Sequence, residues 1–209
     1  MLIGGRGSLL QKLRIGVDVD DVLVESLPAY LELFRRRFGR EVKIEEAAWE
    51  IFRRFPEIPA EEIRGFYAEL EQTDFLGRRP VYQEAVIGVR TLAAAGHRLF
   101  VVTGRLAQHQ DHTRRMLEGA GLLGLFEDLV HRDGESLAGY KPRVLRELGL
   151  QLHIEDELDM ARAVAEVPVP VLLFDRPWNQ GELPEGVTRV GDWEQVVRRV
   201  AEEAAARQP

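Results

Sequence analysis

The chain has 209 residues, 45% of them apolar, and a formal net charge of −7. This length and composition suit one sizeable domain, or a core domain with a modest insert. Its charges are interspersed and no apolar run approaches the roughly 20 residues that span a bilayer, so the composition argues against binding to a nucleic acid polymer or a membrane.

The chain contains no cysteine, which limits the kinds of site that it can form. Disulfides and thiolate metal sites are excluded, so a metal would bind through carboxylate oxygens or histidine. The first residues, MLIGGRGSLLQKLR, do not have the pattern of a secretory signal, and we expect a cytoplasmic protein. The sequence leaves the oligomeric state open.

Short apolar runs alternate with helical patterns along the chain. Runs typical of buried strands cover residues 13–19, 98–102, 129–131, 152–154 and 169–174. Helical spacing marks residues 81–95, 106–118, 142–148 and 157–166. The alternation predicts an α/β fold with a doubly wound parallel sheet.

The segment between the first two strands departs from this alternation. Residues 28–72 have the pattern of three amphipathic helices, PAYLELFRRRFG, IEEAAWEIFRRF and PAEEIRGFYAELEQ. We therefore expect a small helical cap domain at residues 26–79, inserted into an α/β core of residues 1–25 and 80–209. Since the insert follows the first strand, it should stand over the carboxyl edge of the sheet, where open α/β folds bind ligands.

Polar residues stand where several predicted strands end, and parallel strands bring those ends to one edge of the sheet. They are Asp18 and Asp20 after the first strand, Thr103 after the second, Lys141 at the start of a helix, and Glu155 with Asp156 after the fourth strand. Carboxylate oxygens are the ligands that Mg²⁺ prefers, while a hydroxyl and an ammonium group suit an anion beside it.

Four motifs in this order resemble those of haloacid dehalogenase (HAD) superfamily phosphohydrolases. They are DVDDVLV, FVVTGR, GYKP and HIEDELD, which begin at residues 18, 100, 139 and 153. The segments LLFDRPWN and TRVGDWEQV further resemble the 5'(3')-deoxyribonucleotidase-like branch. The resemblance implies a Rossmann-like HAD core and the activity of a phosphatase.

The resemblance also implies a role for each acidic residue. Asp18 would attack phosphorus and form an aspartyl phosphate. Asp20 would protonate the leaving oxygen and then take a proton from the attacking water. Mg²⁺ would be held by the Asp18 carboxylate, the Asp20 backbone carbonyl and the acidic pair Glu155 and Asp156.

The phosphate group would be bound by residues of the second and third motifs. The resemblance implies that Thr103, Gly104 and Arg105 bind the substrate and that Lys141 bridges Asp18 and the phosphate. The partner would be a small phosphorylated compound, with a nucleoside monophosphate as one candidate.

Two departures from the family pattern leave alternatives open. Glu155 stands where many members have Asp, so either Glu155 or Asp156 is the direct metal ligand; Asp159 is a more distant acidic partner or a residue that favours the next helix. Thr103 is followed by Gly-Arg, where characterised deoxyribonucleotidases have Ser-Pro. This difference weakens the nucleotide assignment and makes Arg105 a candidate for substrate contact.

Other residues near the motifs have ordinary structural explanations. We expect Asp21 to be structural, and His109 and His112 to be exposed. Trp178 and Asn179 either shape the pocket or form a turn around a proline. The aromatic residues of the insert should mostly form its own core, and three of them remain candidates for the pocket: Trp49, Phe52 and Phe75.

Two other classes of function also fit some of these features. A phosphorylation-responsive receiver domain combines acidic residues, Thr and Lys on a parallel sheet, but its phosphorylated Asp ends a middle strand, where this chain offers Asp133. A non-catalytic ligand-binding protein of the same fold is the other alternative. The helical insert argues against the first, and the presence of both Asp18 and Asp20 argues against the second.

Overall fold

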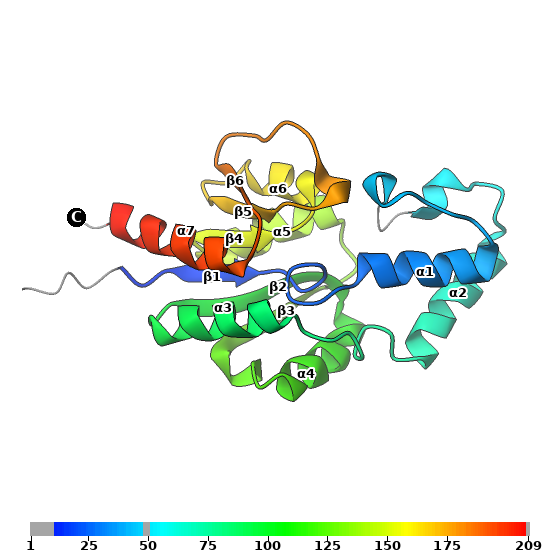
Figure 1. Ribbon diagram of the computed structural model, residues 1–209, viewed down its shortest axis with the longest axis horizontal. Helices are drawn as coiled ribbons and strands as arrows, with labels where there is room; N and C mark the ends of the chain where they lie inside the picture. The colour runs from blue at the N-terminus through cyan, green and yellow to red at the C-terminus, as the bar shows by residue number, and fades with distance from the viewer. Residues whose placement is uncertain (1–10, 48–50, 208–209) are drawn as a thin grey trace, which may run out of the picture.

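A computed structural model describes residues 11–47 and 51–207 of the chain. Within these residues six strands form one sheet in the order β3-β2-β1-β4-β5-β6, and all neighbouring strands are parallel. The strands are β1 (Arg14–Val17), β2 (Arg98–Leu106), β3 (Phe126–Arg132), β4 (Leu152–Glu155), β5 (Val171–Phe174) and β6 (Val187–Val190). The strand order runs outward in both directions from β1, which confirms the predicted doubly wound sheet (Figure 1).

Helices connect the strands and cover both faces of the sheet. The α-helices are α1 (Leu27–Phe38), α2 (Ala60–Gln72), α3 (Gln83–Ala94), α4 (Gln110–Gly119), α5 (Leu137–Glu147), α6 (Leu158–Val164) and α7 (Trp193–Ala206). Short 3-10 helices are η1 (Ile44–Glu46), η2 (Ile51–Arg54), η3 (Ala107–His109), η4 (Leu123–Leu125) and η5 (Pro177–Asn179).

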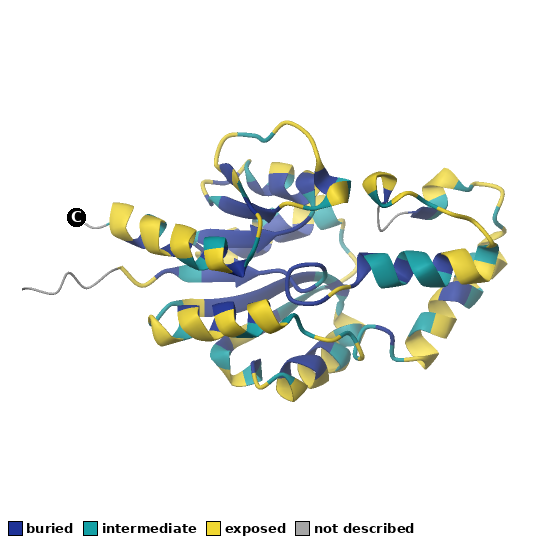
Figure 2. Ribbon diagram, viewed as in Figure 1, coloured by how far each residue is buried: buried dark blue, intermediate teal, exposed yellow. Residues whose placement is uncertain are grey.

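The two faces of the sheet bury separate apolar clusters, because successive strand residues point to opposite sides. In β2, Leu99 and Val101 belong to the cluster that includes side chains of α3, α4 and α7. Phe100 and Val102 belong to the other cluster, which includes side chains of α5 and α6. Figure 2 shows the result: the strands are buried, and the outward faces of the helices are exposed.

A glycine allows β1 and β4 to approach closely beneath the strand ends. A Cβ atom built on Gly16 would lie 2.7 Å from Nδ1 of His153, which is closer than real Cβ contacts. Gly16 and His153 are paired in the parallel register. The absence of a side chain at position 16 therefore leaves room for the buried imidazole that stands next to Glu155.

The insert forms a helical unit beyond the carboxyl ends of the strands, at the right of Figure 1. Its own apolar cluster includes Tyr30 and Phe34 of α1 and Phe66 of α2, all buried. The ring of Phe34 contacts those of Phe52 and Phe66, with centroids 5.4 and 6.4 Å apart. Most aromatic residues of the insert thus form its core, as expected. The domain boundaries at residues 26 and 79 stay a prediction.

The prediction of a second α-helix in the insert is wrong. The structure has the 3-10 helices η1 and η2 there, and residues 48–50 between them lie outside the described part of the chain. Ala47, which follows η1, has extended backbone angles (φ −75°, ψ 149°) that end the helical turn. Pro56 and Pro59 follow η2, and proline disfavours the α conformation in the residue before it.

Two further boundaries and one strand differ from the predictions. Helix α5 begins at Leu137, because Ser136 caps its N-terminus through a hydrogen bond from Gly139 N (3.3 Å), and Pro142 is accommodated inside the helix. Strand β2 continues past Thr103 to Leu106, with an irregularity in its pairing to β3. Strand β6 was missed; it has only four residues, of which two are buried.

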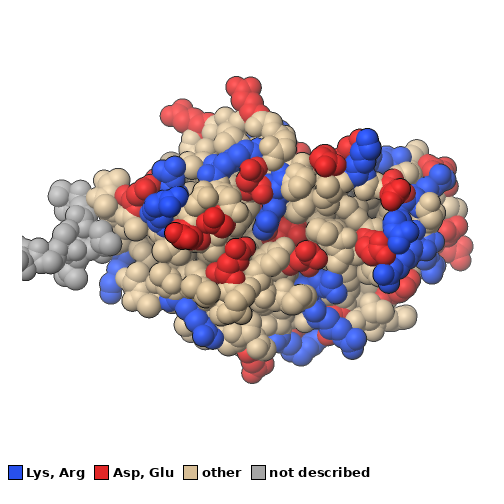
Figure 3. Space-filling model, in the orientation of Figure 1, with Lys and Arg blue, Asp and Glu red and all other residues tan. Residues whose placement is uncertain are grey.

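Charged side chains of both signs are distributed over the surface (Figure 3). Figure 3 shows Lys and Arg side chains mixed with Asp and Glu side chains over the face in view. No helix in the described part of the chain is long and apolar enough to cross a membrane.

Candidate active site

A cavity of about 460 Å³ lies at the carboxyl edge of the sheet, beneath the insert. Most of the residues predicted for the site line it: Asp18, Asp20, Gly104, Arg105, Lys141 and Asp156. Two others, Thr103 and Glu155, are fully buried and are not among its lining residues. The insert contributes an apolar wall of Tyr30, Tyr67, Leu70, Phe75 and Leu76.

Lys141 joins two carboxylates from different strands. Its Nζ donates to Asp18 Oδ2 at 2.9 Å and to Glu155 Oε2 at 2.6 Å. The lysine side chain is only 2% exposed, and those of Asp18 and Glu155 are 9% and 0% exposed. Helix α5 thus places an ammonium group between the ends of β1 and β4, where it offsets part of the repulsion between the carboxylates.

Burial and charge shift the pKa values of these groups in different directions. Burial raises the pKa of Asp18 to about 8; Lys141 opposes this shift, while Glu155 and Asp20 add to it. Burial also disfavours charge on Lys141, but the two carboxylates outweigh it and raise the Lys141 pKa. For Glu155, the ammonium group and His153 together overcome burial and hold its pKa below the usual range.

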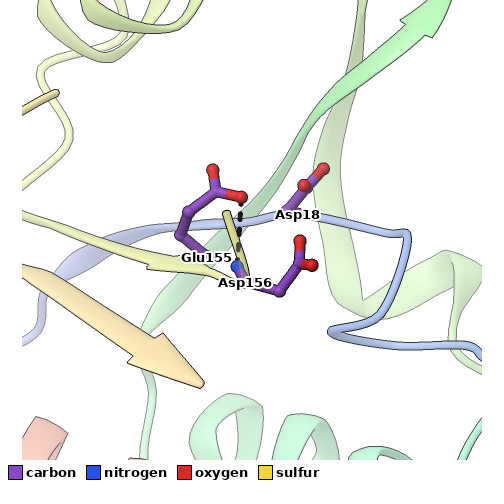
Figure 4. A group of neighbouring side chains, drawn as sticks. All are labelled: Asp18, Glu155 and Asp156. Carbon is purple, nitrogen blue, oxygen red and sulfur yellow. Dashed lines mark hydrogen bonds between the residues drawn. The ribbon is translucent and has the colours of Figure 1, made fainter. Parts of the chain in front are cut away.

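Three buried carboxylates, Asp18, Glu155 and Asp156, lie side by side where β1 and β4 end (Figure 4). Each offers an oxygen within 4.8 Å of the others. Burial and the charges of Asp21, Glu155 and Asp18 raise the pKa of Asp156 well above its usual value. Three acidic groups against one ammonium leave negative charge uncompensated, so this donor set fits a hard divalent cation.

The carboxylate of Glu155 accepts more hydrogen bonds than that of Asp156. Glu155 accepts hydrogen bonds from Lys141 and His153 on Oε2, and from the backbone N of Asp156 and Glu157 on Oε1. Asp156 accepts one from Trp178 Nε1 on Oδ2 (3.0 Å) and lines the cavity. Asp156 is therefore the better placed of the pair to bind a metal directly.

Asp20 is held by an arginine rather than standing free. Arg105 donates from Nε to Asp20 Oδ2 at 2.8 Å and from Nη2 to Oδ1 at 2.7 Å. Ser26 Oγ also donates to Oδ1, at 2.5 Å. Burial disfavours the charged form of Asp20, but the guanidinium group and these hydrogen bonds outweigh it and lower the Asp20 pKa.

Thr103 and Asp21 each accept hydrogen bonds from backbone N–H groups next to the site. Thr103 is fully buried in β2, and its Oγ1 accepts a hydrogen bond from the backbone N of Arg105 at 3.3 Å. Asp21 has a positive φ of 57°, and its carboxylate accepts from the backbone N of Ser26 and Leu27 at 3.0 and 2.9 Å. It thereby fixes the start of α1, which fits the structural role expected of it.

His109 and His112 are half-buried and line the cavity, so the expectation that they are exposed is wrong. His109 lies 3.4 Å from Glu71 of α2, and His112 contacts Asp74 just after that helix. Because each residue pairs with a carboxylate of the insert, neither side chain points freely into solvent. Only the folded chain reveals these pairings, since their partners lie far away in the sequence.

The three aromatic residues predicted as candidates for the pocket lie in different places. Phe75 lines the cavity, Phe52 packs among the rings of the insert, and Trp49 lies outside the described residues. Trp178 lies beside Asp156 and lines a smaller cavity of about 210 Å³. The Asn179 side chain donates to the backbone carbonyls of Asp156 and Phe174 at 2.5 and 2.7 Å and so fixes that turn.

Asp159 and Asp133, the two other acidic candidates from the sequence, do not line the main cavity. Asp159 is exposed and pairs with Arg162 at 3.0 Å. Asp133 is exposed in the loop after β3. Sequence reasoning also missed Arg132, which lines the main cavity and donates to the backbone carbonyls of Gly104 and Glu135 at 3.2 and 2.7 Å.

Solved structures share this architecture. A predicted phosphatase from Clostridium acetobutylicum superposes with a TM-score of 0.71 at 13% identity, covering 92% of this chain and 100% of the other. A HAD family hydrolase from Deinococcus radiodurans R1, solved with bound phosphate and sodium, gives a TM-score of 0.67 at 15% identity, with 93% and 97% covered. These similarities show the shared fold.

Sequence comparison identifies the family. The nucleotidase CA_C3379 of Clostridium acetobutylicum is 23% identical over 189 residues, which are 90% of this chain and 93% of that protein. The family described as "5' nucleotidase, deoxy (Pyrimidine), cytosolic type C protein" matches residues 11–207. This chain belongs to that family of HAD-superfamily, nucleotidase-like phosphohydrolases, and it is a phosphoric monoester hydrolase.

Proposed function

We propose that the chain is a Mg²⁺-dependent phosphatase that hydrolyses a small organic phosphate through an aspartyl phosphate on Asp18. The observation that carries the proposal is the placement of Asp18, whose Oδ2 is bound by Lys141 at 2.9 Å at the bottom of a cavity. The lysine fixes the carboxylate and leaves the other oxygen, Oδ1, available to attack phosphorus.

Lys141 has a second task in this proposal. As Asp18 attacks, negative charge builds up on the phosphoryl oxygens, and the buried ammonium group stands next to the attacking carboxylate. Glu155 holds Lys141 from the other side at 2.6 Å. Because Glu155 keeps the ammonium group in place, we assign it an indirect part in catalysis.

Asp20 is the proposed acid and base. It lies two residues after Asp18 and lines the same cavity, so it can protonate the leaving oxygen while Asp18 attacks. In the second half of the reaction its carboxylate would take a proton from the water that cleaves the aspartyl phosphate. Thr103, Gly104 and Arg105 lie near the end of β2, and Gly104 lines the cavity, where its backbone N–H would bind the phosphate.

The carboxylates of Asp18 and Asp156, with the backbone carbonyl of Asp20, are the proposed Mg²⁺ ligands. The metal, when bound, would neutralise charge between the nucleophile and the incoming phosphate. The all-oxygen, buried and strongly acidic donor set supports this choice of ion. Solved relatives of the same fold include a HAD-hydrolase from Bacillus subtilis bound to magnesium.

The proposed substrate is a small phosphate ester, and a nucleoside monophosphate is the leading candidate. The family description and the Clostridium relative both refer to nucleotidases. A cavity of about 460 Å³ falls within the usual range for small-molecule sites, and its wall includes Tyr30, Tyr67 and Phe75, whose rings can pack against an apolar or aromatic leaving group. The insert, residues 26–79, would act as the cap that encloses this leaving group.

The test is a phosphate-release assay of the purified chain with p-nitrophenyl phosphate, nucleoside monophosphates and sugar phosphates. Activity that requires Mg²⁺, is abolished by EDTA and is lost in Asp18→Asn supports the proposal. Preference for nucleoside monophosphates within the panel supports the substrate class. Absence of Mg²⁺-dependent phosphate release from every compound, by protein that is folded, would contradict it.

A further inference from the structure

Arg105 contacts Asp20 in a way that orients the whole carboxyl group. Its Nε and Nη2 bind one oxygen each, at 2.8 and 2.7 Å, which is the two-point geometry that guanidinium groups form with carboxylates. The Arg105 side chain is 2% exposed and that of Asp20 is 15% exposed. The pair is therefore shielded from water on the arginine side, while Asp20 stays open to the cavity.

The guanidinium group is itself held in place. Its Nη1 donates to the backbone carbonyl of Leu76 and to Thr113 Oγ1, both at 3.3 Å. Leu76 belongs to the last part of the insert, after α2, and Thr113 belongs to α4. Fixed from two sides, Arg105 has little freedom to leave Asp20 and reach into the cavity, as a substrate-binding arginine would.

The two carboxyl oxygens of Asp20 accept different numbers of hydrogen bonds. A carboxylate offers about four lone-pair positions, two on each oxygen. Oδ1 accepts from Arg105 Nη2 and from Ser26 Oγ, whereas Oδ2 accepts from Arg105 Nε. These contacts leave one position, on Oδ2, for a proton that is exchanged with a ligand in the cavity.

We propose that Arg105 is a positioning residue that holds Asp20 so that proton transfer to and from the substrate takes place at Oδ2. This inference rests on the proposed function. In the first step Asp18 forms a bond to phosphorus while the ester P–O bond breaks, the proton of the protonated Asp20 passes from Oδ2 to the ester oxygen, and Asp20 becomes a carboxylate bound to Arg105. In the second step water attacks phosphorus, the P–O bond to Asp18 breaks, and one proton of the water passes to Oδ2 of Asp20.

This role predicts that the effect of losing Arg105 depends on the leaving group. An alkoxide, such as that of a nucleoside 5'-monophosphate, leaves poorly without a proton, whereas p-nitrophenolate leaves without one. The constant kcat/KM covers only the steps up to departure of the leaving group, so it isolates the first proton transfer from the second. A residue that binds the phosphate would affect both substrates equally, because their phosphate groups are the same.

The experiment measures kcat/KM of the wild type, Arg105→Gln and Arg105→Lys with a nucleoside 5'-monophosphate and with p-nitrophenyl phosphate, at saturating Mg²⁺. General acid catalysis contributes typically 10²- to 10⁴-fold. We expect Arg105→Gln to lose about 10- to 100-fold more on the nucleotide than on p-nitrophenyl phosphate. Arg105→Lys should show the same selective loss, because one ammonium group cannot bind both carboxyl oxygens in a fixed plane.

Arg132→Gln is the matched control, since Arg132 is another arginine that lines the cavity but binds backbone carbonyls instead of Asp20. Its effect should be equal on the two substrates. Activity on p-nitrophenyl phosphate also shows that each variant is folded. If Arg105→Gln does not fold, Arg105→Lys still provides a variant with a buried positive charge beside Asp20.

Equal losses of kcat/KM on both substrates, or no loss on either, in the Arg105 variants would overturn the inference. A wild type inactive on both substrates would instead refute the proposed function, and with it the inference.

Discussion

The ammonium group of Lys141 lies 2.9 Å from Asp18 Oδ2, although 123 residues separate the two in the chain. The contact requires β1, which ends at Val17, and α5, which carries Lys141, to meet at the same edge of the sheet. A third group, Glu155 at the end of β4, binds the same ammonium at 2.6 Å. The parallel sheet therefore assembles one charged cluster from three distant segments.

Replacing Lys141 by methionine should reduce both activity and stability. The change keeps much of the side-chain volume but leaves the buried carboxylates of Asp18 and Glu155 without their cation. Breaking a buried pair in this way costs about 3–5 kcal/mol, and loss of one electrostatic stabiliser of the transition state costs about 10²- to 10³-fold in kcat. Urea unfolding and phosphate release measure the two effects. Lys43→Met, at an exposed site, is the control and should change neither.

Binding of Mg²⁺ should stabilise the fold through Asp156. At a Mg²⁺ concentration 100 times its Kd, binding adds about 2.7 kcal/mol to the free energy of unfolding. Asp156→Asn removes one proposed ligand and one of the mutually repelling carboxylates. We expect this variant to lose the Mg²⁺-dependent rise in Tm. A rise as large as in the wild type would show that Asp156 does not bind the ion.

Without a metal, stability should fall as the pH rises. Burial raises the pKa of Asp18 from its usual value of 3.8 to about 8, and it also raises the pKa of Asp156. Between pH 3.8 and about 8 the folded state binds more protons on Asp18 than the unfolded state does, so the free energy of unfolding decreases by up to about 1.4 kcal/mol per pH unit through Asp18. Asp156 adds a decrease of the same sign. Denaturant unfolding of EDTA-treated protein from pH 6.5 to 8 tests this sign, because His97, His131 and His153, whose pKa values burial lowers, have the opposite effect below about pH 6.5. A free energy of unfolding that increases over this range would contradict the account.

Substituting Gly16 by alanine should destabilise the sheet beneath the site. The new methyl group would lie 2.7 Å from His153 Nδ1 and 2.9 Å from Leu150 Cδ1, both of buried residues. Overpacking of this kind costs about 1–3 kcal/mol. Gly124→Ala is the control, because nothing lies within 4 Å of a Cβ atom at that position. Thermal unfolding of both variants measures the difference, and equal Tm values would refute the close approach.

The sequence was sufficient to predict the sheet and the residues gathered at its edge. Buried strands have strong apolar runs, and parallel strands bring their carboxyl ends together, so Asp18, Lys141 and Asp156 could be placed near one another without a structure. The short strand β6 was missed because two of its four residues, Thr188 and Arg189, are not buried. The start of α5 was missed because Pro142 suggested a first turn, although a proline can be accommodated further inside a helix.

The partners of individual side chains could not be predicted in the same way. Arg105 was a candidate for substrate contact because it follows Thr103, but its guanidinium group binds Asp20, 85 residues earlier. Glu155 and Asp156 are adjacent in the sequence, and only their hydrogen bonds show which one is already engaged by Lys141 and His153. Pairings of this kind depend on packing between segments, which hydrophobic periodicity does not encode.

The most direct test of the central claim is to trap the phosphorylated enzyme. Protein mixed with substrate and Mg²⁺ is quenched in acid within a turnover, reduced with borohydride, and analysed by peptide mass spectrometry. An acyl phosphate on Asp18 would be reduced to homoserine at position 18, and this is the result we predict. Substrate turnover accompanied by unmodified Asp18, or by homoserine at a different position, would contradict Asp18 as the nucleophile.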